Sequence, residues 1–159
     1  MRQASIELCP PSGRTPMAEA SKTTLIRKLA IPTKGDTKLV LYCAPDSFRL
    51  PRLPIHVRVE YEDERSQSKD PVAIVLAFFR QAAEIPPALD VLCPRIYPNG
   101  AIWGAWPRRA TGHLSDITDN TIRTEALSRG LVDVKVAVLD DDWSGLRLVW
   151  RLEERTRPQ

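Results

Sequence analysis

The sequence contains few of the residues that hold metal sites and disulfide frameworks together. Its 159 residues include three cysteines and two histidines, and the cysteines at positions 9, 43 and 93 form no C-x-x-C pair. Zinc sites and disulfide frameworks both depend on closely spaced cysteines, so we expect neither and predict no cofactor of this kind. Isolated cysteines are typical of reduced thiols, which predicts a cytoplasmic protein.

Long apolar runs are also missing. The longest extends from Val72 to Phe79, which is the length of a strand and well below the roughly 18 residues needed to cross a bilayer. The N-terminal residues include no apolar segment typical of a signal peptide. The net charge is +3, which does not indicate nucleic-acid binding. We therefore expect neither a membrane nor a nucleic acid as partner.

The remaining composition is that of one globular domain. Hydrophobic residues make up 43% of the chain and charged residues 27%, as in ordinary soluble domains. Residues 1–20 begin with a proline-rich segment that has no apolar period, and we expect a disordered arm there. Residues 21–154 are predicted to form a single α/β domain, followed by a polar tail over residues 155–159.

Six segments have the length and apolar content of strands. Ile55–Tyr61 alternates apolar and polar residues, which predicts a half-exposed strand near a sheet edge. Leu131–Leu139 and Leu146–Leu152 flank the acidic segment Asp140–Gly145, which predicts a hairpin. The other three are apolar throughout, as strands buried on both faces are: Thr37–Ala44, Pro71–Phe79 and Ala101–Trp106.

Helices are expected between several of these strands. They cover Ser21–Ala30, Arg80–Val91 with an interruption at Pro86 and Pro87, and a segment capped by Thr118 and ended by Gly130. At the interruption, Pro87 could be the first residue of a second helical turn. Alternation of strands and helices predicts a parallel sheet with right-handed crossovers. The predicted fold is a Rossmann-like three-layer α/β sandwich, whose mostly parallel sheet ends in an antiparallel hairpin strand, as in the methyltransferase-like variant. We expect the strand that contains Trp103 near the middle of that sheet.

Five motifs are distributed along the chain: LIRKL from Leu25, NGAIWGAWPRR from Asn99, DIT from Asp116, GLVDVKV from Gly130 and WSGLRLV from Trp143. Together they resemble a family of short bacterial proteins, the domain-of-unknown-function family number three-zero-five-two. The resemblance covers about Leu25 to Glu153 and implies a reduced methyltransferase-like Rossmann fold without an assigned activity.

The first turn after a strand is where a Rossmann-like fold usually holds its cofactor. Here the turn from Tyr42 to Phe48 contains no glycine, and Pro45 lacks a backbone N–H. Dinucleotide binding and S-adenosylmethionine binding are therefore both disfavoured. Such cofactor sites usually have an acidic residue at the end of the second strand, and Glu60 or Glu62 is only a nominal match for it. A small S-adenosylmethionine-dependent transferase with an altered pocket is the alternative. An open cleft beside Ala44 would favour it.

The predicted binding site is a basic rim at the carboxyl ends of the strands. It consists of Arg80, Trp106, Arg108 and Arg109, and arginines bind phosphate or carboxylate groups bidentately. This predicts a non-catalytic binding or regulatory protein of the bacterial cytoplasm that takes a small anion or a protein partner. The competing interpretation is a set of solvated surface arginines. Self-association through the rim or through an edge strand is a third interpretation.

Two further groups of residues could carry chemistry. Cys43 and His113 are placed on the same rim and could form a nucleophile pair, although a buried, inert thiol is the stronger interpretation. The three aspartates that begin at Asp140 could bind a metal, although a plain hairpin turn fits them better. Trp103 and Trp106 are predicted on opposite faces of one strand, mainly as core residues.

Overall fold

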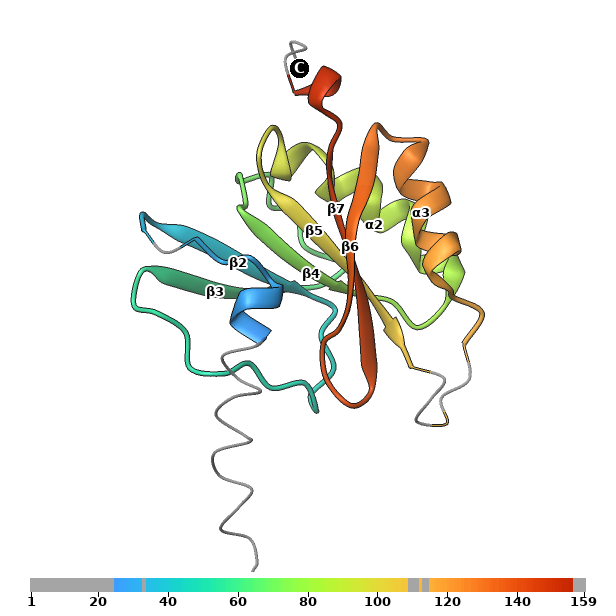
Figure 1. Ribbon diagram of the computed structural model, residues 1–159, viewed down its shortest axis with the longest axis horizontal. Helices are drawn as coiled ribbons and strands as arrows, with labels where there is room; N and C mark the ends of the chain where they lie inside the picture. The colour runs from blue at the N-terminus through green and yellow to red at the C-terminus, as the bar shows by residue number, and fades with distance from the viewer. Residues whose placement is uncertain (1–24, 33, 109–111, 113–114, 156–159) are drawn as a thin grey trace, which may run out of the picture.

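The computed structural model describes residues 25–155 apart from 33, 109–111 and 113–114, and it contains a six-stranded mixed sheet. The strands run in the order β3-β2-β4-β5-β7-β6 (Figure 1). This confirms an α/β fold, and the arrangement is compatible with a Rossmann-like fold. The strand bounds are β2 Thr37–Tyr42, β3 Val57–Glu62, β4 Ile74–Phe78, β5 Ala101–Pro107, β6 Leu131–Val138 and β7 Trp143–Trp150.

Most of the sheet is parallel, and its antiparallel part lies at one end. Strands β3, β2, β4 and β5 pair in parallel, whereas β7 is antiparallel to both β5 and β6. The hairpin is confirmed, but its loop is shorter than predicted, because the Leu139 amide donates to the Trp143 carbonyl at 2.8 Å. The Asp140 carboxylate accepts from the amides of Asp142 and Trp143, so this acidic run forms the hairpin turn.

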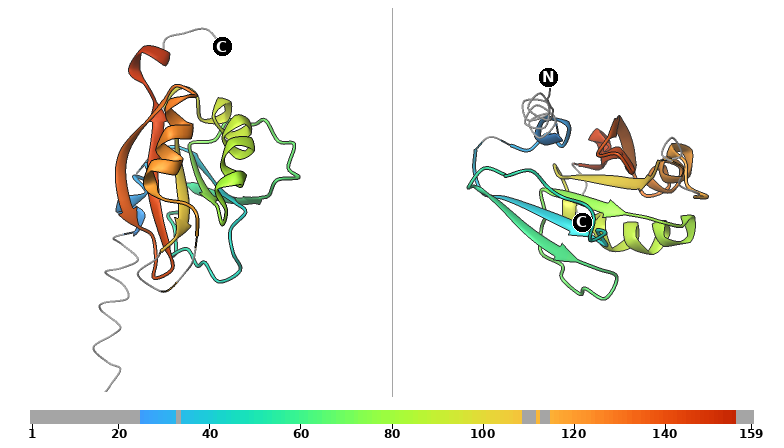
Figure 2. Two further views of the ribbon diagram at one scale, coloured as in Figure 1. Left: turned by 90° about the vertical axis from the view of Figure 1, so that its right-hand side faces the viewer. Right: turned by 90° about the horizontal axis from the view of Figure 1, so that it is seen from below.

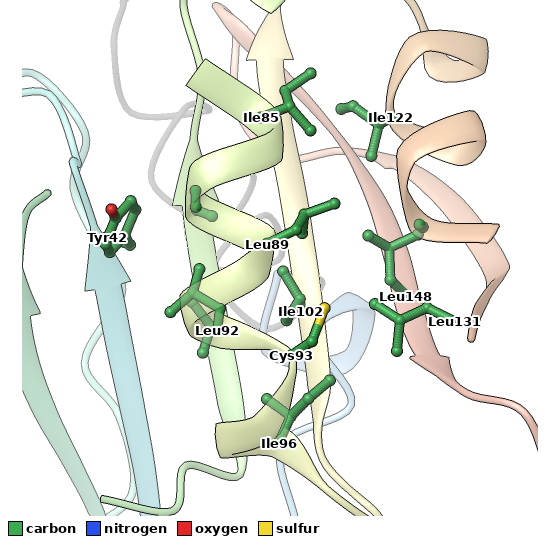
Figure 3. Close-up of a cluster of buried hydrophobic side chains, with 14 of the residues drawn as sticks. Tyr42, Ile85, Leu89, Leu92, Cys93, Ile96, Ile102, Ile122, Leu131 and Leu148 are labelled. Atoms are coloured by element: carbon green, nitrogen blue, oxygen red, sulfur yellow. The ribbon is translucent and has the colours of Figure 1, made fainter. Parts of the chain in front are cut away.

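Two helices cover one face of the sheet, here called the first face. They are α2 Ile85–Leu92 and α3 Asp119–Leu127, and their apolar side chains meet those of β5, β6 and β7 in one core cluster (Figure 3). The opposite, second face carries a separate cluster that includes Leu25, Phe48 and Trp103. A single helical turn at residues 25–28 lies on that side, across the sheet from α2 (Figure 2). No helix in the described part of the chain is long and apolar enough to span a bilayer.

The predicted break lies before the prolines rather than at them, and the prolines stand near the start of a helix, as the alternative interpretation of Pro87 expected. The short helix η1 Ala82–Glu84 comes first, and α2 then begins at Ile85 with both prolines in its first turn. Proline is well placed there, because the first amides of a helix have no partner within it. The short helices η2 Pro94–Ile96 and η4 Leu152–Glu154 follow α2 and β7, and β7 ends at Trp150 rather than at residue 152.

The prediction for β3 is confirmed, because it forms one edge of the sheet. From Val57 to Glu60 its residues alternate between half-buried and exposed, with Arg58 and Glu60 exposed, whereas Tyr61 is exposed too and breaks the alternation. The other edge strand, β6, instead exposes Val134, Val136 and Val138. Charge at a free edge opposes pairing with another chain. The edge at β3 is therefore better protected against pairing with another chain than the edge at β6.

Candidate functional site

The connections of the sheet diverge between β2 and β4. After β2 the chain turns toward β3, and Phe48 of this connection packs on the second face. After β4 the chain turns the other way, toward β5, through α2 on the first face. Ligands of open α/β sheets bind outside the carboxyl ends of the strands at such a reversal. The carboxyl ends of β2, β3 and β4 are therefore the first place to look for a site.

A cavity of about 430 Å³ opens at the ends of β2 and β3. Its volume lies within the range of small-molecule pockets. The described residues that line it include three carboxylates and neither lysine nor arginine. The lining residues are Leu41, Cys43, Ala44, Asp46, Tyr61, Glu62, Asp63 and Ser66.

Cys43 forms the turn at the end of β2. Its φ angle is 58°, in the left-handed region that residues other than glycine seldom adopt. Its amide donates to the Glu62 carbonyl at 2.8 Å, its thiol donates to Glu64 Oε2 at 3.3 Å, and its carbonyl accepts from Arg80 Nη1 at 3.5 Å. The turn therefore forms without the glycine that the sequence lacks, because Cys43 itself takes the conformation that glycine favours.

The surroundings of Cys43 keep its thiol protonated. The pKa of Cys43 is raised to about 11, mainly by burial and in part by the hydrogen bond to Glu64. Burial likewise raises the pKa of Tyr42 to about 12, with added contributions from Cys43 and the nearby carboxylates. Because the thiolate is the nucleophilic form, this geometry does not favour Cys43 as a nucleophile. His113, its predicted partner, lies outside the described residues.

Glu62 is the acidic residue at the end of β3, and it is already paired. Arg95 Nη1 lies 2.7 Å from Glu62 Oε1, and Arg95 Nη2 lies 3.1 Å from Oε2. The two side chains are 8% and 3% exposed, and the hydrogen bonds from Arg95 lower the pKa of Glu62. Arg95 also donates to the Asp70 carbonyl and to Ser68 Oγ, so it holds the connection between β3 and β4 in place.

Arg95 is not among the residues that the sequence pattern predicts for a site. Its partner Glu62 lies 33 residues earlier in the chain, and nothing in the local pattern distinguishes Arg95 from a surface arginine. The one available signal is its position between Cys93 and Ile96, which are both buried.

Two members of the predicted basic rim, Arg80 and Arg108, contact the hairpin between β6 and β7. Arg80 lies 5.8 Å from the centre of the Trp143 ring, whereas Arg108 Nη1 donates to the Asp141 carbonyl at 3.1 Å. Trp106 and Arg108 line a second cavity of about 380 Å³ beside the start of α3, and Arg80 is not part of that lining. Arg109 lies outside the described residues. The other lining residues are Ile117, Thr118, Asp119, Val138 and Ser144.

Comparison with known proteins adds no further constraint. No family model matches the sequence, and no curated protein matches it. Among the described residues, no group of three histidine, cysteine or acidic side chains could hold a metal ion. The chemistry of the two cavities is therefore the basis for a functional proposal.

Proposed function

We propose that this chain is a non-catalytic binding protein on a methyltransferase-like variant of the Rossmann fold. Its ligand is a small molecule with a positive charge, held in the cavity at the ends of β2 and β3. The observation that carries the proposal is the acidic lining of that cavity at the point where the sheet connections diverge. The order β3-β2-β4-β5-β7-β6, with β7 antiparallel, supports the methyltransferase-like variant.

The charge of the lining supports a cationic ligand. Glu62 is neutralised by Arg95, which leaves Asp46 and Asp63 as the carboxylates available to a ligand. Arg65 pairs with Asp63 at 3.4 Å, but its side chain is 86% exposed, so solvent screens most of that interaction. A ligand cation placed between Asp46 and Asp63 would gain from both carboxylates.

The cysteine in the cavity wall supports binding rather than covalent chemistry. At neutral pH a thiol whose pKa is about 11 is almost entirely protonated. Its proton is donated to Glu64, which lies beside the cavity. The role of Cys43 in this proposal is to form the turn after β2 and not to react with the ligand.

An S-adenosylmethionine-dependent transferase is the second candidate, and one observation favours it. The cleft beside Ala44 is open, and Phe48 packs against Phe78 on the second face instead of filling it. The amides of Ala44 and Asp46 donate no hydrogen bond to any described residue, so a ligand could accept from them. The fit is partial, because both oxygens of Glu62, the residue placed to bind a ribose diol, are held by Arg95.

Thermal unfolding of the full chain at increasing ligand concentration separates these candidates. The probes are S-adenosylmethionine, its neutral thioether product S-adenosylhomocysteine, and spermidine as a cation without a nucleoside. A ligand at a hundred times its Kd adds about 2.7 kcal/mol, which corresponds to a melting shift of about 5–11 °C. Binding of S-adenosylmethionine and spermidine without binding of S-adenosylhomocysteine supports the proposed cation site. Binding of both S-adenosylmethionine and S-adenosylhomocysteine supports the transferase. The absence of binding by any probe refutes both.

A matched pair of variants tests the site. In Asp46→Asn combined with Asp63→Asn, we expect cation affinity to fall at least tenfold with little change in melting temperature. The control is Asp36→Asn, which removes one negative charge from an exposed residue just before β2, at the opposite end of that strand from the cavity. Equal affinity in the double variant and the control would place the ligand elsewhere.

A further inference from the structure

Two buried hydrogen-bond donors on the second face of the sheet have no partner within the described ranges of the chain. They are the indole Nε1 of Trp103 and the guanidinium Nε of Arg147, and neither has a hydrogen-bond acceptor in the described part of the chain. Buried polar groups nearly always have a partner, and a missing one calls for an explanation such as an absent ion. The two side chains are therefore candidates for a binding site outside the cavity at β2 and β3.

These residues are neighbours in the sheet. Trp103 of β5 is directly opposite Arg147 of β7, and Arg147 is directly opposite Lys135 of β6. Directly opposed residues share a face, so the three side chains form a row across three strands. Trp103 belongs to the core cluster of the second face, which places the whole row there. The pairing joins two motifs noted in the sequence, the one that begins at Asn99 and the one that begins at Trp143.

Arg147 is a half-buried cation that has no counter-ion among the described residues. No carboxylate of the described residues forms an ion pair with it, and none pairs with the exposed Lys135 beside it. Burial lowers the pKa of Arg147, and the charge of Arg155 lowers it further. A guanidinium that is partly removed from water and repelled by a second cation is destabilised unless an anion approaches it.

We propose that Arg147, with Lys135 beside it, binds the phosphate or carboxylate group of a small anionic molecule on the second face of the sheet. The planar guanidinium offers a two-pronged set of donors that matches the oxygens of either group. Lys135 adds a second positive charge from the edge strand. This site is independent of the cationic ligand proposed for the cavity at β2 and β3.

The test compares the response of the full chain to anions at constant ionic strength. Inorganic phosphate and citrate are titrated against chloride while the melting temperature is followed. The wild-type protein should show a saturable rise with at least one of the two anions, and the identity of that anion distinguishes the phosphate and carboxylate sources. Arg147→Met should lose the rise, which corresponds to an affinity at least tenfold weaker. Lys135→Gln should reduce the affinity by a smaller factor, because Lys135 is exposed.

Three controls keep the result interpretable. Arg58→Met removes an exposed arginine from the opposite edge strand and should leave the anion response unchanged. Arg147→Lys keeps the charge without the two-pronged geometry, so it should fold and bind more weakly even if Arg147→Met fails to fold. The Arg147 Nε–Hε resonance should shift as the anion is added. A saturable rise that survives in Arg147→Lys at wild-type affinity, or no rise in the wild type with either anion, would overturn the proposal.

Discussion

Removal of Arg95 should be among the most damaging single changes to this protein. Arg95 is 4% exposed and pairs through both of its terminal nitrogens with Glu62. Replacement by methionine fills a similar volume but leaves the Glu62 carboxylate buried without its cation. The carbonyl of Asp70 and the hydroxyl of Ser68 also lose a donor.

The size of the effect follows from the cost of an unpaired buried charge. Breaking a buried ion pair by removing one partner costs about 3–5 kcal/mol. For a chain of this length, each kcal/mol lowers the melting temperature by about 2–4 °C, so we expect a fall of about 6–20 °C. The double variant Glu62→Gln with Arg95→Met should be more stable than Arg95→Met alone, because it no longer buries an unpaired carboxylate.

The same pair predicts a dependence on pH. Arg95 lowers the pKa of Glu62 in the folded state below the value of about 4.3 expected in the unfolded chain. The resulting stability is fully present above pH 4.3 and is lost as pH falls through the lower folded value. Urea unfolding at pH 7 and at pH 3 measures both effects, with Glu62→Gln as the variant that lacks this titration. An Arg95→Met protein within 1 kcal/mol of wild type at pH 7 would refute the reasoning.

Two further predictions follow from local geometry. Gly100→Ala should lower the free energy of unfolding by about 1–3 kcal/mol. The reason is that the added Cβ would lie 2.8 Å from the Val72 carbonyl and 2.9 Å from the Ile96 carbonyl. Urea unfolding measures this free energy, and an unchanged midpoint would contradict the prediction. Cys43 should react with iodoacetamide far more slowly than a free thiol at pH 7.5, with a rate that rises toward pH 11, as peptide mapping by mass spectrometry can follow. Glu64→Gln should speed that reaction, and an equal rate in both proteins would contradict the assigned role of Glu64.

The sheet was largely predictable because its strands are marked by local patterns. Val75 and Ile102 lie in continuous apolar runs, and both are fully buried in the middle of the sheet. The alternation around Arg58 correctly predicted an edge. The start of α2 was misplaced by two residues, because a proline pair can interrupt a helix or stand in its first turn. The outcome depended on η1, whose residues carry no distinct pattern.

The candidate sites were less predictable because they depend on contacts between distant segments. The absence of a glycine after β2 was read from the sequence, but the left-handed conformation of Cys43 was not. Trp103 was correctly predicted as a core residue, whereas its unpartnered indole nitrogen depends on the register between β5 and β7. Patterns along one strand cannot reveal which donors on the next strand lack an acceptor.

The connection between β3 and β4 links stability to binding. This connection contains no helix. The neighbouring strands β2 and β3 carry the ion pair of Lys38 and Glu60, at 3.2 Å, instead of an apolar surface on which a helix could pack. Ser66 of this connection lines the cavity and donates to Glu62 Oε1 at 3.1 Å, so one carboxylate serves both the fold and the cavity wall.

A ligand that drew Glu62 away from Arg95 would leave a buried guanidinium unpaired, at a cost of about 3–5 kcal/mol. Binding at that cost would be weak, since about 1.4 kcal/mol corresponds to a tenfold change in affinity. A ligand cation is therefore best held by Asp46 and Asp63, while Glu62 stays with Arg95. For this reason the pair Asp46→Asn and Asp63→Asn, rather than Glu62→Gln, is the change that separates loss of binding from loss of the fold.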